Sequence, residues 1–150
     1  MRARPHHLID IVCQHGAGRP FEPHSYGHAV HSVAAEVIGN PDVLIEFVVD
    51  ADAICAPCVH LVDGRCDDMI TLCDPPISKQ QYNDALDRRV LAALGMAEGE
   101  EMSFREYLET LRAEMQKLRV VYSHPDVLAL GGDPDRRLAR LRAGLEKLEA

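Results

Sequence analysis

The sequence predicts an α+β protein that is predominantly helical, with about five helices, a small sheet and a cysteine-rich metal-binding loop. Most of the 150 residues follow the apolar repeat of amphipathic helices. One segment, 43–49, alternates like a strand, and four of the five cysteines lie between residues 55 and 73. The length suits a single domain, 1–150, in which 1–75 form a metal-binding half and 76–150 a helical scaffold.

The charge of the chain is acidic and uneven. The net charge is −8, of which residues 1–75 contribute −7 (4 basic, 11 acidic residues) and residues 76–150 contribute −1 (12 basic, 13 acidic). An acidic surface repels phosphate backbones, so we expect no nucleic acid partner. The same acidity raises the local concentration of cations around the cysteine half.

The chain shows no signal for a membrane or for export. It has no run of about 20 apolar residues, and its N-terminus lacks the apolar core of a signal peptide. We therefore expect no membrane contact and a cytoplasmic location. Thiols stay reduced in the cytoplasm, so clustered cysteines are expected to bind a metal rather than to form disulfides.

A first helix is predicted from Pro5 to about Gly16, because proline suits a first helical turn and an apolar stripe follows it. His6, Asp10 and Cys13 recur at i, i+4 and i+7, so they share a second face. This face is either a solvated polar surface or a ligand and acid–base face turned toward the cysteines.

A second helix is predicted from about His24 to Gly39, after the loop that ends at Pro23. His24, His28 and His31 fall at i, i+4 and i+7 on one face of it. Zinc enzymes use helical histidine pairs at i and i+4 to hold two metal ligands. These histidines therefore contact either a metal or a substrate, or they are packed, hydrogen-bonded or solvated side chains.

Residues 43–49 are predicted to form the one clear strand, because alternate residues along this segment make one almost wholly apolar face. Asn40-Pro41 separates this strand from the preceding helix, and its end leads directly into the cysteine loop. A strand needs a hydrogen-bonded neighbour, for which Val59–Val62 and Val120–Tyr122 are the candidates.

The second half begins after Pro75-Pro76 and is helical. Ser78 with Gln81 marks the start of a helix that ends at Gly95, and Ser103 with Glu106 marks the start of the next. Asp133-Pro134 begins a last helix with leucines at 3-4-3 spacing: Leu138, Leu141, Leu145 and Leu148. This stripe suggests a docking surface, such as a homodimer formed through the C-terminal helix.

The cysteine loop reads C-x2-C-x7-C-x6-C. Two residues between Cys55 and Cys58 let a tight turn aim both sulfurs at one centre, and Cys66 completes the tightest trio. Cys73 or Cys13 could supply a fourth thiolate. An oxygen, an imidazole or an open fourth position would instead make the site reactive, because an exchangeable position lets a substrate reach the metal. Thiolates favour zinc and iron–sulfur clusters alike, so the spacing leaves both open.

Two motifs resemble a known family. Arg4-Pro5-His6-His7-Leu8, together with Ile54-Cys55-x-x-Cys58 and Cys66, resembles the small bacterial and archaeal proteins grouped as domain-of-unknown-function family 1284. The resemblance extends over about residues 2–95 and includes Asp87-Arg88-Arg89. It implies an iron–sulfur cluster held by Cys55, Cys58 and Cys66.

The fourth ligand differs from the family pattern. Many relatives carry a cysteine at the position that Asp10 occupies in this chain. The resemblance therefore leaves four candidates for the fourth ligand: Asp10, Cys13, Cys73 or an exchangeable group.

The first functional hypothesis is a metalloprotein with a [4Fe–4S] cluster on Cys55, Cys58 and Cys66. An exchangeable iron would make the cluster a Lewis acid or sulfur-handling centre for a small-molecule substrate. Imidazoles titrate near working pH, so the expected proton donors and acceptors are His6, His7, His28 and His31.

The second hypothesis is a structural zinc module on Cys55, Cys58, Cys66 and Cys73 that acts as an interaction protein. A zinc hydrolase built on the helical histidines is a third and weaker reading, because the chain lacks an H-E-x-x-H sequence. No serine elbow, P-loop or dinucleotide fingerprint is present in the sequence.

Overall fold

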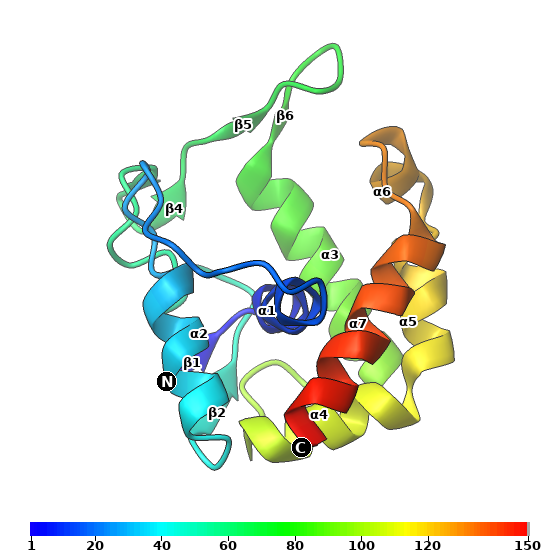
Figure 1. Cartoon of the computed structure of the whole chain (residues 1–150). Coiled ribbons are helices and arrows are strands. Elements are labelled where there is room, and N and C mark those ends of the chain that lie inside the picture. The colour runs from blue at the N-terminus through cyan, green and yellow to red at the C-terminus, as the bar shows by residue number, and fades with distance from the viewer. Residues whose placement is uncertain (150) are drawn as a thin grey trace.

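Helix α1 (Pro5–Gly16) runs through the middle of the molecule in the computed structural model, which describes residues 1–149 (Figure 1). Helices α3 (Lys79–Leu94) and α7 (Pro134–Glu149) lie on one side of it, and α2 (Val30–Gly39) lies on the other. Pro5 occupies the first turn of α1, as predicted. Ile9 and Ile11 lie on nearly opposite sides of α1 and are both buried, in agreement with its central place. Ala150, the last residue of the predicted domain, lies outside the described residues.

Strand β2 (Leu44–Phe47) is the middle strand of a three-stranded sheet. It pairs in parallel with β1 (Arg2–Ala3) and antiparallel with β7 (Glu101–Ser103). Neither predicted neighbour was right, because 120–122 is helical and 61–62 pairs with another strand. The true neighbours are only two and three residues long, too short to show an alternating pattern.

The predominantly helical α+β class is confirmed, but the described residues hold seven helices rather than about five. The helix predicted from Ser103 is interrupted at Glu114, which separates α4 (Phe104–Ala113) from α5 (Met115–Tyr122). A short helix, α6 (Pro125–Ala129), follows. The predicted starts of α3 and α4 are confirmed, since Ser78 accepts a hydrogen bond from the Gln81 N–H and Ser103 forms a capping box with Glu106.

The predicted start of the second helix at His24 was wrong, because α2 begins only at Val30. Gly27 has a φ of +74°, which ends any helical path. The 24–29 segment instead lies along the cysteine loop: the Ala29 N–H donates to Ile54 O (3.0 Å), and Tyr26 O accepts from the Val59 N–H (2.8 Å). Tertiary hydrogen bonds thus replace the helical ones.

Two small hairpins carry the chain from the cysteine loop to α3. Strands β3 (Leu61–Val62) and β4 (Arg65–Cys66) form the first, and β5 (Met69–Ile70) and β6 (Ile77–Ser78) form the second. The turn of the first hairpin uses positive φ angles at Asp63 and Gly64. The second hairpin extends away from the helices (Figure 1).

The leucines of α7 pack inside the chain. Leu138, Leu141 and Leu145 are buried in the hydrophobic core that also contains α1. The stripe that suggested a dimer is therefore used within one chain, and the dimer stays a prediction. No helix within residues 1–149 has the length and apolarity needed to cross a membrane.

Candidate metal centre

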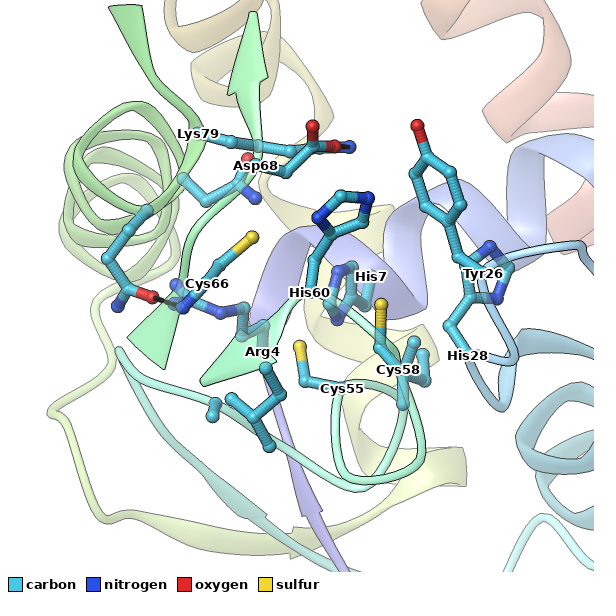
Figure 2. A pocket seen from close by; sticks show the side chains of 15 residues that line it. Arg4, His7, Tyr26, His28, Cys55, Cys58, His60, Cys66, Asp68 and Lys79 are labelled. Atoms are coloured by element: carbon cyan, nitrogen blue, oxygen red, sulfur yellow. Dashed lines mark hydrogen bonds and ion pairs between the residues drawn. The ribbon is translucent and has the colours of Figure 1, made fainter. Parts of the chain in front are cut away.

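Three of the five cysteines line one small cavity. Cys55, Cys58 and Cys66 face a space of about 90 Å³ between the cysteine loop, the start of α1 and the start of α3. Figure 2 shows their sulfur atoms turned toward this shared space. The three thiols that the spacing grouped are thus brought together by the fold.

Different hydrogen bonds position the Cys55–Cys58 turn and Cys66. Cys55 and Cys58 lie on one turn, where the Cys58 N–H donates to Cys55 O (2.9 Å). Cys66 lies on β4, and its N–H donates to Oε1 of Gln80, a buried residue in the first turn of α3 (2.8 Å). The loop and the hairpin are therefore positioned independently against the helical scaffold.

Asp52 fixes the start of the cysteine loop. Its side chain is fully buried, and its Oδ1 accepts hydrogen bonds from the N–H groups of Ile54 (3.0 Å) and Cys55 (3.1 Å). Its Oδ2 accepts from the Arg4 N–H (2.7 Å) and lies 2.8 Å from His7 Nδ1. Burial acts to raise the pKa of this carboxyl, but His7 and the backbone N–H groups hold it well below its usual range. Asp52 therefore stays ionised and joins α1 to the loop.

The side chains of the Arg4-Pro5-His6-His7 motif contact two different carboxylates, those of Asp87 and Asp52. Arg4 Nη1 donates to Asp87 Oδ2 (2.8 Å), and His6 contacts Asp87 Oδ1 through its N–H (3.0 Å) and its Nδ1 (2.8 Å). Burial opposes a charged imidazole, yet the nearby Asp87 carboxylate raises the pKa of His6. His6 thus lies in a buried ion-pair network with α3, whereas His7 lines the cavity.

His28 and His31, the other two histidines predicted to transfer protons, also lie in different places. His28 lines the cavity beside Tyr26, and burial together with the nearby His24 lowers its pKa. His31 lies on α2 and does not line this cavity. The Nδ1 atoms of His28 and His31 are buried without a hydrogen-bond partner among residues 1–149. Of the four predicted proton donors, His7 and His28 are therefore beside the thiols.

None of the protein candidates for the fourth ligand lines the cavity. Asp10 forms an ion pair with Arg137 of α7, and the thiol of Cys13 lies 3.7 Å from Arg137 O, at another face of α1. Cys73 lies beyond β5, with its sulfur 3.7 Å from Ile70 O. Arg137 and the path of the second hairpin are long-range features that residue spacing could not reveal.

Sequence reasoning missed three residues of the site. His60 lines the cavity, and its Nδ1 lies 2.8 Å from Asp67 Oδ1. Gln80 and Asp52 hold Cys66 and Cys55, respectively. The one local signal was Asp52, because an aspartate that precedes a turn commonly accepts hydrogen bonds from N–H groups two and three residues later.

The environment of Cys55 does not favour a free nucleophile. Burial, followed by the nearby Asp52 carboxylate, raises the pKa of Cys55 to about 12. A nucleophilic cysteine needs a lowered pKa, so this environment opposes that chemistry. A bound cation offsets both the burial and the neighbouring negative charge, because it binds the thiolate directly.

The described residues also include one compact group that could hold a metal ion. His7, Asp52 and Cys55 each offer a ligand atom, and these atoms lie within 4.8 Å of one another. The group joins α1 to the first cysteine of the loop. A metal is therefore compatible with the chemistry and the geometry of this end of the cavity.

The fold and the site together define a helical α+β protein with a cavity lined by cysteines and histidines. The family model described as "Protein of unknown function (DUF1284)" matches residues 24–123, so the chain belongs to this family. The expected family is confirmed, but the match begins after the Arg4–Leu8 motif and extends beyond residue 95. No match was found among curated proteins or among solved structures.

Proposed function

We propose that this protein binds an iron–sulfur cluster, of the [4Fe–4S] type, through Cys55, Cys58 and Cys66. The observation that carries the proposal is that three thiols from a C-x2-C-x7-C segment line one cavity. Iron–sulfur clusters are held by cysteine thiolates, and a CxxC turn is a common part of their ligand loops.

The spacing of the sulfurs supports a cluster over a single ion. Tetrahedral zinc binds sulfur at about 2.3 Å, which places two sulfur ligands about 3.8 Å apart. Among residues 1–149, the three ligand atoms found within 4.8 Å of one another come from His7, Asp52 and Cys55, not from the three cysteines. A cluster accepts wider spacing, since each thiolate binds a different iron atom.

A closed zinc module on four cysteines has less support. Cys73 does not line the cavity that the other three share, so the four thiols are not gathered around one point. A role for such a module as an interaction protein stays a prediction.

A cluster with three thiolate ligands supplies an iron that can act as a Lewis acid or exchange electrons. The residues of the chain would bind a small-molecule substrate and move protons. His7 and His28 line the cavity and are the groups suited to that task. We also infer a reducing compartment, the cytoplasm, because all five cysteines are free thiols.

The test is elemental analysis of protein purified without oxygen, with or without reconstitution by iron and sulfide. We expect iron and inorganic sulfide in equal amounts, with broad visible absorption that is lost on reaction with a chelator. Cys55→Ser, Cys58→Ser and Cys66→Ser should each lose most of the iron. Cys73→Ser is the matched control and should retain it.

Two results would overturn the proposal. One is wild-type protein that binds neither iron nor sulfide under these conditions. The other is an equal loss of iron in Cys73→Ser and in the three cavity variants, which would point to a different set of ligands.

A further inference from the structure

We propose that His7 is the fourth protein ligand of this centre, through its Nε2 atom, and that Asp52 is the positioning residue that selects this nitrogen. The inference rests on the proposed iron–sulfur function and assigns a position that the thiols leave open. It assigns the imidazole that the sequence left open to His7, in the first turn of α1, in place of Asp10, Cys13 and Cys73. Proton transfer in the cavity is then left to His28.

The hydrogen bond to Asp52 determines which nitrogen of His7 is free to bind the metal centre. An ionised carboxylate only accepts hydrogen bonds, so His7 Nδ1, at 2.8 Å from Asp52 Oδ2, must carry the proton. In the neutral imidazole, the form that binds a metal, the lone pair is then on Nε2. Histidines that bind metals almost always donate their other ring N–H to a carboxylate, a carbonyl or a water in this way.

Asp52 itself is poorly placed to be the ligand. Its two oxygens already accept three backbone N–H groups and the His7 ring, which uses the four lone pairs of the carboxylate. A ligand bond from Asp52 would break one of the contacts that shape the cysteine loop. Its place in the compact group with His7 and Cys55 is therefore better explained by holding the other two.

His28 and His60 are the competing histidines, and His60 supplies the control because it has a carboxylate partner as His7 does. It also lines the cavity and also has a carboxylate at 2.8 Å from its Nδ1. Its partner Asp67 is 55% exposed, whereas Asp52 is completely buried. Water competes with an exposed pair and lets the ring reorient, so His7 is held more rigidly than His60.

The direct test is pulsed electron paramagnetic resonance on the reduced, reconstituted wild-type protein labelled with ¹⁵N-histidine. A coordinated imidazole gives a strong nitrogen hyperfine coupling, and we expect this coupling in wild type. His7→Cys should keep the cluster, lose the coupling and lower the reduction potential, because a thiolate replaces a neutral ligand. His60→Ala should leave the coupling and the potential unchanged.

The role of Asp52 is tested by the same spectrum. Asp52→Asn should alter the nitrogen coupling, because the amide no longer holds the ring as an anion does. Asp50→Asn is the control, since Asp50 is exposed and its one side-chain hydrogen bond within residues 1–149 is from the N–H of Ala51. Far-ultraviolet circular dichroism should confirm that both variants are folded, and Asp52→Glu offers a second variant if Asp52→Asn is not.

The outcomes separate the two proposals. Protein without iron and sulfide overturns the proposed function, and with it this inference. A cluster that shows no strong histidine nitrogen coupling overturns the role of His7 alone. A coupling that persists in His7→Cys but disappears in His60→Ala assigns the ligand to His60 instead.

Discussion

At the scale of single residues, two buried carboxylates decide what the first turn of α1 presents to the cavity. Asp52 holds His7 beside the thiols, while Asp87 holds His6 against α3. Arg4 pairs with Asp87 as well, but it also lines the cavity. Adjacent histidines thereby take different roles. Removing one partner of a buried ion pair leaves the other charge uncompensated, at a cost of about 3–5 kcal/mol.

We predict that Asp87→Asn lowers the free energy of unfolding by about 3–5 kcal/mol near neutral pH. Burial acts to raise the pKa of Asp87, but the contacts with His6 and Arg4 outweigh burial and hold this pKa below its ordinary value. The stabilisation is therefore complete above the unfolded pKa of about 3.9 and is lost as the pH falls through the lower, folded pKa. Urea unfolding of wild type and Asp87→Asn at several pH values measures this difference.

Asp42→Asn is the control for that series. Asp42 pairs with Arg105 at 2.8 Å, but both side chains are exposed. Exposed pairs contribute little to stability, so this variant should unfold almost as wild type does. An equal loss of stability in the two variants would show that burial of Asp87 does not set its contribution.

At the scale of elements, the close contact between α1 and α7 depends on two glycines. A Cβ atom on Gly16 would lie 2.5 Å from Gly144 N, and one on Gly144 would lie 2.7 Å from Val12 Cγ1 and closer still to Val12 O. Neither distance allows a side chain. The two helix backbones therefore touch at this point, and α7 is held against the helix that carries His7.

We predict that Gly144→Ala destabilises the protein by about 1–3 kcal/mol, because the methyl group forces the helices apart. In an open helix the same change is stabilising by up to about 1 kcal/mol. Gly39→Ala, at the end of α2, is the matched control, since its Cβ would meet no atom within 4 Å. Thermal unfolding should give opposite signs for the two variants, and the same sign for both would contradict the packing argument.

At the scale of the whole molecule, the cavity joins a well-packed helical part to a lightly packed loop and hairpin region. Buried apolar residues are concentrated on the helices and β2. The loop and hairpins instead expose large apolar side chains, such as Val59 at 65% and Leu72 at 79%. Few buried contacts hold this region in place, so a centre bound by Cys55, Cys58 and Cys66 would stabilise it.

We predict that removing the metal centre speeds trypsin cleavage after Arg65, the first residue of β4. Each 1.4 kcal/mol of local stability that the centre supplies corresponds to about a tenfold change in the open population. Cleavage after Arg142 in α7 is the internal control and should change little. Mass spectrometry of timed digests measures both rates, and equal rates at Arg65 with and without the centre would contradict the prediction.

Much of the helical fold could be predicted because its signals are local. The caps at Ser78 and Ser103 act within three residues, and Pro134 begins α7 where the sequence places it. The end of α3 at Gly95 is likewise local, through a left-handed residue. The start of α2 could not be predicted, because hydrogen bonds to the distant cysteine loop override the helical pattern at 24–29.

The sequence by itself determined the starts of α1, α3, α4 and α7, the middle strand and the grouping of three cysteines, since each depends on residues close together in the chain. Only the tertiary structure decided which groups face those thiols. Asp52 meets His7 across 45 residues, Arg4 meets Asp87 across 83, and Arg137 reaches Asp10 across 127. Packing between helices and loops brings these partners together, so the spacing of residues along the chain does not predict them.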